Sequence, residues 1–179
     1  FYMQIRDQQL SVMAGNYGFG RMMVNAGRSS SCGIELSLRC SALDNRLRWS
    51  AGYGFTRAVF KEYADSVNTD GGNVAVDYKD NYVPFVPQHT FSATADYTIG
   101  KLTIGANVAG QGKTYWDEAN DYSQKLYATV GAHADYSLGC AVVSLWGRNL
   151  TATKYNTFAV ESAATGTKHV FAQQGNPLQ

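Results

Sequence analysis

Two residues with a possible chemical role, His133 and Asp135, stand two positions apart in a segment where apolar and polar residues alternate. In an extended strand this spacing places both side chains on one face, about 7 Å apart. A His beside a carboxylate can serve as the base of a hydrolytic site, provided that a nucleophile converges on the same face. That strand contains no Ser, although a neighbouring strand could supply one. We therefore interpret the pair as hydrated side chains on a polar wall.

The remaining candidates for chemistry are also weak. His89 follows Pro-Phe-Val-Pro-Gln and His169 lies in the final predicted loop. Acidic residues gather in two predicted loops, Asp65, Asp70, Asp77 and Asp80 in one, and Asp117, Glu118 and Asp121 beside Trp116 and Tyr122 in the other. The second group could bind a cation or a ligand, but solvated loops are the favoured interpretation of both. With no His-x-His motif, catalytic carboxylate pair or phosphate-binding Gly loop, we expect no enzyme, cofactor or metal.

The three cysteines are not expected to form a framework of disulfide bonds. Cys32, Cys40 and Cys140 are odd in number, and Cys32 and Cys40 fall on one predicted strand. They would lie about 26 Å apart there, too far for a disulfide. No Cys-x-x-Cys or Cys/His spacing typical of zinc is present. We expect the three cysteines to act as small apolar side chains on a buried or lipid-facing surface.

The composition excludes several classes of protein. Of 179 residues only 16% are charged and the net charge is +1, so nucleic-acid binding is not expected. No apolar run approaches the roughly 18 residues of a membrane-spanning helix. The first residues, Phe-Tyr-Met-Gln-Ile-Arg, lack the basic and apolar regions of a signal peptide. They begin in the middle of a predicted strand, which suggests a fragment.

The dominant pattern is strict alternation of apolar and polar residues, which predicts half-exposed β-strands. Between residues 32 and 40 every even position is apolar, and between 47 and 55 every odd position is Leu, Trp, Ala, Tyr or Phe. The expected strands cover residues 32–41, 47–56, 90–99, 102–108 and 126–136, with less regular ones near 1–5, built on Phe1, Met3 and Ile5, and 140–150. Residues 57–64 could form a short helix, but a strand continuing into a loop is favoured.

The connections alternate in length. Tight turns are expected at 43–46, 99–101 and 137–139, and long polar or irregular connections at about 13–31, 61–87, 113–124 and from 151 onward. Strands of about ten residues with short turns at one end and long loops at the other are typical of outer-membrane barrels. We therefore predict an all-β, antiparallel up-and-down transmembrane barrel that is only partly present.

The two faces of the strands support this interpretation. The predicted apolar face carries no charge in its regular stretches, whereas the polar face carries Gly, Ser, Thr and Asn with sparse Arg48, Asp96, His133 and Asp135. Small polar side chains suit the wall of a wide lumen, and Tyr97 and Tyr136 fall near strand ends, where aromatic girdles lie. A soluble β-sandwich, acting as a binding or adhesin-like module, would explain the alternation equally well. It would not explain the unequal connections.

Several short motifs carry a resemblance to a known family. They are Asn25-Ala26-Gly27 followed by Gly33-Ile34-Glu35, Pro84 to Thr90, Gly112 with Tyr115-Trp116-Asp117 and Asn120, Gly147 to Thr151 with Tyr155, and Gly175-Asn176-Pro177. In this order they resemble the C-terminal barrel of TonB-dependent outer-membrane receptors. Leu178 departs from the family, which usually has Arg after its Gly-x-Pro. The resemblance implies that residues 1–179 are about seven strands of a barrel of roughly 22, without the plug domain and the closing strand.

The resemblance further implies a receptor in the bacterial outer membrane that takes up a scarce nutrient, such as an iron chelate, a vitamin or a glycan. Its partners would be the lipid bilayer, the small ligand, and TonB acting through the plug. Since an open sheet leaves unpaired edges, an isolated copy is expected to pair with other chains or to need detergent. From alternation and position we predict ligand-facing residues near the outer rim, namely Thr56, Gln111, Tyr115, Trp116 and Tyr127.

Overall fold

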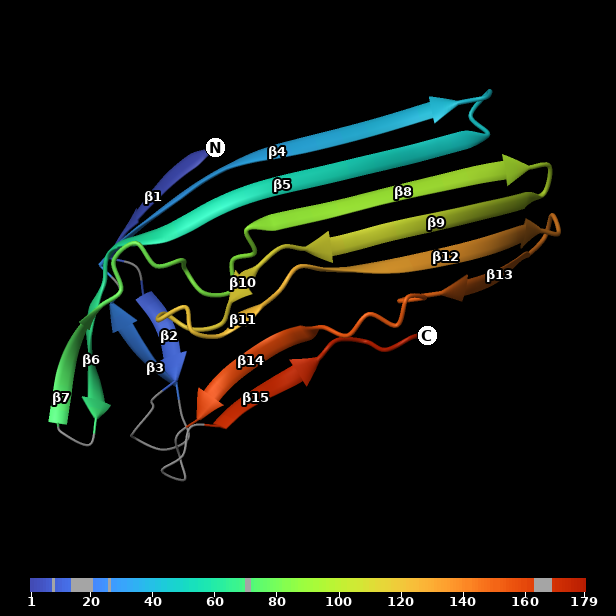
Figure 1. Ribbon diagram of the computed structural model, residues 1–179. Coiled ribbons are helices and arrows are strands. Elements are labelled where there is room, and N and C mark those ends of the chain that lie inside the picture. The colour runs from blue at the N-terminus through green and yellow to red at the C-terminus, as the bar shows by residue number, and fades with distance from the viewer. Residues whose placement is uncertain (8, 14–20, 26, 70–71, 163–168) are drawn as a thin grey trace.

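The computed structural model describes all residues except 8, 14–20, 26, 70–71 and 163–168. Its main element is a seven-stranded antiparallel sheet in the order β1-β4-β5-β8-β9-β12-β13 (Figure 1). The strands are Tyr2–Arg6 (β1), Arg28–Ala42 (β4), Leu47–Glu62 (β5), His89–Ile99 (β8), Leu102–Gln111 (β9), Tyr127–Ser137 (β12) and Val142–Gly147 (β13). The predicted all-β, up-and-down antiparallel architecture is confirmed. No helix among the described residues is long and apolar enough to cross a lipid bilayer.

The limits of several strands differ from the prediction. β4 starts at Arg28 and β5 runs to Glu62, so the segment from Arg57 onward is a strand, as favoured, and not a short helix. β13 is shorter than expected and ends at Gly147, because Asn149 soon afterwards has a positive φ of 49°. A residue in this left-handed conformation cannot continue a strand.

All three tight turns lie at one end of the sheet, on the right in Figure 1. In the turn between β4 and β5, Leu43, Asp44 and Asn45 have positive φ. In each of the other two turns a glycine has positive φ, Gly100 in one and Gly139 in the other. The predicted turn positions are confirmed. We call this end the short-turn end and the opposite end the loop end.

The long connections are not irregular, and in this respect the prediction was wrong. They contain antiparallel hairpins, formed by Gln9–Met13 and Arg21–Asn25 (β2, β3), Ala64–Thr69 and Gly72–Asp77 (β6, β7), Thr114–Tyr115 and Ser123–Gln124 (β10, β11), and Asn156–Ser162 and His169–Gln174 (β14, β15). Main-chain hydrogen bonds hold such hairpins without requiring an apolar face on either side. Their strands are two to seven residues long, too short for alternation to reveal them as it revealed the long strands.

The register confirms that the sheet has one apolar and one polar face. Ala93 of β8 lies between Ala51 of β5 and Val108 of β9, whereas its neighbour Ser92 lies between Gly52 and Ala109. β1 is oriented differently from the other long strands, because Met3 and Ile5 pair with Ser31 and Ser29. The apolar residues of β1 therefore point to the polar side of β4, and Tyr2, Gln4 and Arg6 point to the apolar side.

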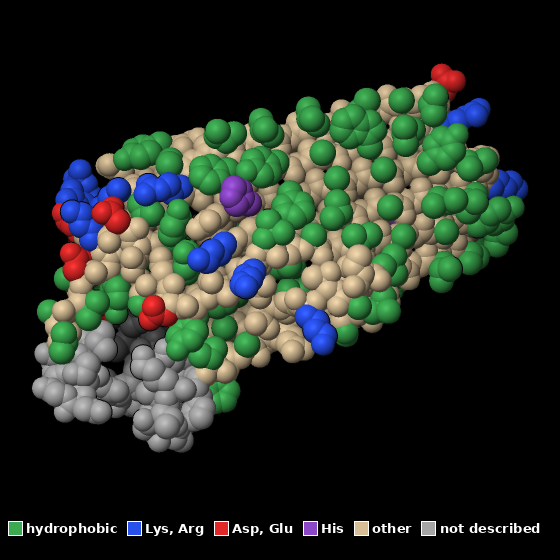
Figure 2. Space-filling model, viewed as in Figure 1, with side chains coloured by type: hydrophobic (Ala, Val, Ile, Leu, Met, Phe, Trp, Pro, Cys, Tyr) green, Lys and Arg blue, Asp and Glu red, His purple; other side chains and the backbone are tan. Residues whose placement is uncertain are grey.

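The packed core lies at the loop end and not beneath the sheet. Buried Ala58, Phe60, Tyr63 and Val83 form it, with the half-buried Tyr78 and Val86 around them. By contrast, Leu38 on the apolar face is 62% exposed and Leu145 is 77% exposed. Figure 2 shows hydrophobic side chains spread over the long strands with no protein layer upon them. The described residues therefore leave the apolar face uncovered.

Candidate functional site

The connections at the loop end are bound into the sheet and extend it as a rim. Residues 78–83 pair with the end of β5, through hydrogen bonds from Phe60 N to Asn81 O (2.9 Å) and from Val83 N to Ala58 O (3.0 Å). The chain then continues beside β10, where Gln88 N donates to Lys113 O at 3.0 Å. We use the word rim for residues 56–65, 78–88, 111–127 and 154–159. It is built from strand-like segments and hence has a defined shape.

Asn120 fixes the tip of the β10–β11 connection. Its Oδ1 accepts a hydrogen bond from Tyr82 N at 2.7 Å, and its Nδ2 donates to Tyr82 O at 2.9 Å and to Asp117 O at 3.0 Å. The Asp117 carboxylate in turn accepts the backbone N–H groups of Asp121 and Tyr122. The Asn120 amide and the Asp117 carboxylate therefore hold the loop together, which gives Asp117 a structural role.

Three of the predicted ligand-facing residues belong to the polar face. Gln111 lies opposite Thr90 on one side and Tyr127 on the other, and Thr90 pairs with Gly54 of the polar face. The ring of Tyr127 stacks on Tyr155 at 4.2 Å between centroids. Thr56 lies two residues after Gly54 in β5 and therefore on the same face of the sheet. Its backbone N–H donates to Gln88 O at 3.0 Å. These three residues thus stand where the polar face meets the rim.

The other two predicted residues, Tyr115 and Trp116, lie on opposite sides of the rim. The Tyr115 ring stacks on Tyr82 at 5.6 Å, and Tyr82 is paired with Val59, which is on the apolar side of β5. Trp116 faces the other way and packs at 5.6 Å against Phe85, which itself stacks on Phe158. Ligand contact by any of the five residues stays a prediction.

A buried acidic and phenolic cluster lies next to the rim core. Burial raises the pKa of the Glu118 carboxyl, and the neighbouring Asp117 and Asp65 carboxylates raise it further. Burial likewise raises the pKa of the Tyr63 and Tyr78 hydroxyls, with Glu118 and Asp65 contributing to both. Charge on Glu118 is therefore unfavourable in the folded rim.

We expect Glu118→Gln to stabilise the rim at neutral pH. The pKa of Glu118 in the folded state lies above its ordinary value of 4.5, so folding is favoured by protonation. The protonated carboxyl therefore makes its full contribution to the stability of the folded rim at pH values below 4.5. This contribution is lost as the pH rises through the pKa of Glu118 in the folded state. Thermal unfolding followed by tryptophan fluorescence should show a higher midpoint for the variant at about pH 8 and an equal midpoint at about pH 4. Asp44→Asn at the short-turn end is the control. An equal midpoint at the higher pH would contradict the expected charge penalty.

His133 lies between two carboxylates on the polar face near the short-turn end. Its Nε2 is 3.6 Å from Asp96 Oδ1 and 3.5 Å from Asp135 Oδ2. Gly105 separates Asp96 from His133 in the register, and a Cβ there would collide with both side chains. The sequence predicted the pair with Asp135 but missed Asp96, because only cross-strand register reveals it. Two carboxylates thus flank one imidazole on the polar face.

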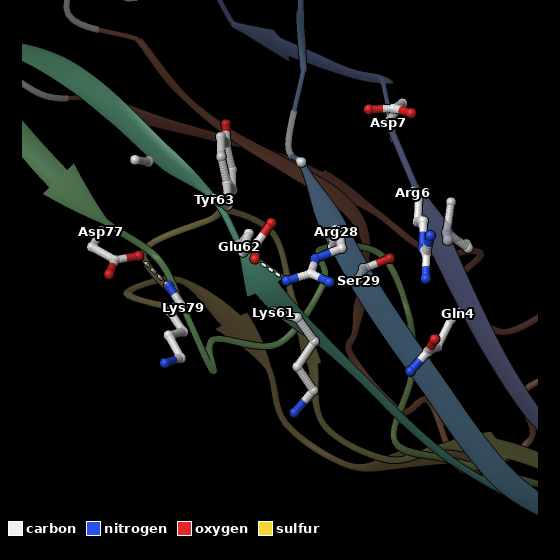
Figure 3. Close-up of a pocket in the computed structure, with 13 residues that line it drawn as sticks. Gln4, Arg6, Asp7, Arg28, Ser29, Lys61, Glu62, Tyr63, Asp77 and Lys79 are labelled. Carbon is white, nitrogen blue, oxygen red and sulfur yellow. Dashed lines mark hydrogen bonds and ion pairs between the residues drawn. The ribbon is translucent and has the colours of Figure 1, made fainter.

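A groove of about 850 Å³ opens beside β1, β4 and β5 at the loop end (Figure 3). It is lined by charged residues of both signs, namely Arg6, Arg28, Lys61, Lys79, Asp7, Glu62 and Asp77. Figure 3 shows Arg28 reaching Glu62 in an ion pair. Asp77 Oδ1 accepts the backbone N–H of Lys79 at 2.9 Å. None of the five predicted ligand-facing residues lines this groove. Among the residues that the structure describes, no group of His, Cys, Asp and Glu could hold a metal ion.

These features together define a class of protein. The sheet is antiparallel and up-and-down, one face is apolar and uncovered, and structured loops gather at one end. That combination is the wall of a transmembrane β-barrel with its loops on one side of the membrane.

The chain belongs to the TonB-dependent receptor-like β-barrel family, whose model matches residues 1–150. It is 32% identical over 125 residues to the ferrioxamine receptor of Yersinia enterocolitica, covering 69% of this chain and 16% of that one. It is 29% identical over 148 residues to a probable TonB-dependent siderophore receptor, PiuA, of Acinetobacter baumannii, covering 77% and 19%. The chain thus spans less than a fifth of these relatives. The family consists of transport receptors of the Gram-negative outer membrane.

Solved structures show the same fold. The crystal structure of the siderophore receptor PiuA from Acinetobacter baumannii matches 99% of this chain with a TM-score of 0.74 at 22% identity, over 24% of its own length. The ferric yersiniabactin uptake receptor FyuA from Yersinia pestis matches 99% with a TM-score of 0.75 at 22% identity, over 25% of its length. The sheet is therefore a section of a TonB-dependent receptor barrel.

Proposed function

We propose that this chain is the C-terminal part of the barrel wall of an outer-membrane receptor for TonB-dependent uptake of an iron chelate. The observation that carries the proposal is the uncovered apolar face, combined with membership of the receptor family. A soluble sandwich would bury that face against a second sheet. The adhesin-like alternative is accordingly not favoured.

The names of the relatives support an iron chelate over a vitamin or a glycan. One relative is a ferrioxamine receptor and another a probable siderophore receptor. A siderophore complex is a polar small molecule, and it would approach from the loop end along the polar face. Thr56, Gln111, Trp116 and Tyr127 stand on that route, with Tyr115 on the far side of the same rim.

The family also suggests the other partners. The bilayer would cover the apolar face, the short-turn end would face the periplasm, and the loops would face the exterior. TonB would act through a plug domain elsewhere in the receptor, and no nucleic acid is expected. Pairing between isolated copies of this segment also stays a prediction, since the edges β1 and β13 would need partners.

The triple variant Gln111→Ala/Trp116→Ala/Tyr127→Ala tests this function in the full-length receptor. Cells that express the wild-type receptor should accumulate radioactive iron supplied as ferrioxamine, and the receptor should be recovered in the outer-membrane fraction. We expect the variant to bind ferrioxamine at least about tenfold more weakly, because aromatic anchors at an interface each contribute about 1 kcal/mol or more.

Asn107→Ala is the matched control, since Asn107 is exposed on the polar face away from the rim. Tyr115→Ala separates the two sides of the rim, and its affinity should fall only if the ligand reaches the apolar side. Unchanged affinity in the triple variant would reject the proposed ligand-facing set. Absence of the receptor from the outer membrane would reject the function itself.

A further inference from the structure

The tip of the β10–β11 connection, residues 117–121, closes onto the segment that follows β7. Asn81 Nδ2 donates to the backbone carbonyl of Glu118 at 2.8 Å. The Asn120 amide exchanges hydrogen bonds of 2.7 and 2.9 Å with the backbone N–H and carbonyl of Tyr82. We call this set of hydrogen bonds the tip contact. Because these bonds compete with hydrogen bonds to water, a modest change in local charge is enough to open the contact.

The base of the same connection is held in a different way. Trp116 N donates to Tyr122 O at 3.0 Å, and the Tyr115 ring stacks on Tyr82 at 5.6 Å between centroids. Next to these residues β10 pairs with β11 in an antiparallel ladder. The tip contact can therefore open while the ladder and the ring stack at its base stay formed.

The half-buried Glu118 side chain lies at the tip contact, beside two phenols. Its charge acts on the hydroxyls of Tyr63, which follows β5, and Tyr78, which follows β7. Tyr63 is only 3% exposed, and its ring lies 5.2 Å from the ring of Tyr78. The Glu118 carboxyl is therefore at the edge of the aromatic core of the rim, where it is only partly hydrated.

The charged groups that act on Glu118 are acidic. Burial raises the pKa of the Glu118 carboxyl, and the negative charges of Asp117 and Asp65 raise it further. Asp117 is on the tip itself and Asp65 is in β6, so the repulsion comes from two elements. Asp121, also on the tip, acts on the neighbouring Tyr78. An ionised Glu118 would therefore add negative charge to a cluster that is already acidic.

The cations of the neighbouring segments are engaged elsewhere. Lys61 Nζ lies 3.7 Å from Asp80 Oδ1, and the charge of Lys79 acts on Glu62. Neither lysine is among the groups that act on Glu118. Within the described part of the chain, the closed tip therefore offers an ionised Glu118 no compensating cation.

We propose that the tip contact is a pH-sensitive closure at the ligand entrance, closed when Glu118 carries a proton and open when Glu118 is ionised. This inference rests on the proposed function, because Tyr115 and Trp116 of the predicted ligand-facing set begin the same connection. An open tip would hold these side chains less firmly. The iron chelate is therefore expected to bind more tightly in acid than at neutral pH.

Linkage determines the direction of this effect. In the closed form the pKa of Glu118 lies above its ordinary value of 4.5, so a proton on Glu118 favours closure. The preference for the closed form is complete below that ordinary value and is lost as the pH rises through the raised pKa. Each unit by which closure raises the pKa changes the ratio of closed to open forms about tenfold between low and high pH.

Hydrogen exchange of the full-length receptor in detergent, without ligand, tests the closure. The backbone amides of Tyr82, Asp121 and Tyr122 report on it, because each donates to a side chain of the tip. Their protection factors, which are corrected for the intrinsic effect of pH on exchange, are measured from about pH 5 to about pH 8. We expect protection to fall about tenfold or more in the wild type and to stay high in Glu118→Gln.

Two further variants and a binding measurement make the test specific. Asp44→Asn, which removes an exposed carboxylate at the short-turn end, is the matched control and should behave as the wild type. Asn120→Ala removes the bonds to Tyr82 and should lower protection at both ends of the pH range. Ferrioxamine affinity of the wild type should be about tenfold weaker at the higher pH, and that of Glu118→Gln should stay constant.

Protection and affinity that fall together with rising pH in the wild type, but not in Glu118→Gln, would support the inference. Constant protection in the wild type, or an equal fall in Glu118→Gln, would overturn it. Protection that falls while ferrioxamine affinity stays constant would overturn the link between the tip and the ligand entrance. A receptor that shows the pH-dependent protection but binds no ferrioxamine at any pH would count against the proposed chelate and not against the closure.

Discussion

An Arg in place of Ala93 is expected to destabilise the folded barrel by about 2 to 4 kcal/mol. Ala93 lies midway along the apolar face, between Ala51 and Val108 in the register. In a bilayer its side chain would be in hydrocarbon, where a guanidinium loses its hydration and finds no counter-ion. Urea unfolding of the full-length receptor in lipid vesicles measures the difference.

Ser92→Arg is the control for this experiment. Ser92 precedes Ala93, is exposed on the polar face, and lies between the small residues Gly52 and Ala109. The same Arg there should change the free energy of unfolding by less than about 0.5 kcal/mol. If the two substitutions cost the same, the apolar face would not be the lipid-facing side, and the barrel interpretation would fail.

Replacing Asn149 by Ala is expected to destabilise the receptor by about 2 to 4 kcal/mol, through loss of three part-buried hydrogen bonds to backbone groups. Asn149 is only 5% exposed. Its Nδ2 donates to Thr153 O at 3.0 Å and to Asn176 O at 2.9 Å, and its Oδ1 accepts Thr153 N at 2.9 Å. The amide thus joins the segment after β13 to the C-terminal residues.

Asn149→Asp and Asn107→Ala make this prediction specific. Asp keeps the shape and the acceptor but removes the two donated hydrogen bonds, so it should cost nearly as much as Ala. Asn107 is exposed on the polar face, and its loss should be nearly neutral. A neutral Asn149→Ala, measured by the same urea unfolding, would show that the junction is held by the backbone alone, for instance by the reciprocal bonds between Arg148 and Gln179.

Alternation in the sequence was sufficient to predict the long strands, their faces and the tight turns. Each of these depends on local chemistry, since a strand with one face in lipid must alternate and Gly100 and Gly139 must take positive φ. The sequence predicted β1 from Phe1, Met3 and Ile5 but left its face open, and these residues lie on the polar side of β4. Only the register of the neighbouring strand determines that orientation.

The rim was the part that sequence could not predict. Its hairpins are held by main-chain hydrogen bonds, and its core forms from Phe60 in a strand and Val83 in a connection. Tyr115 and Trp116 were grouped from position alone, while their separation onto two sides follows from the pairing of Tyr82 with Val59. The proximity of Asp96 to His133 likewise needed the register across Gly105.

The location of the buried core has a consequence for how such a receptor can diversify. Phe60 and Val59 are fully buried where the wall meets the connections, so side-chain packing as well as main-chain hydrogen bonds holds the connection that follows β5. If the proposed function holds, the outer connections could change in sequence while the packed base that joins them to the wall stays the same.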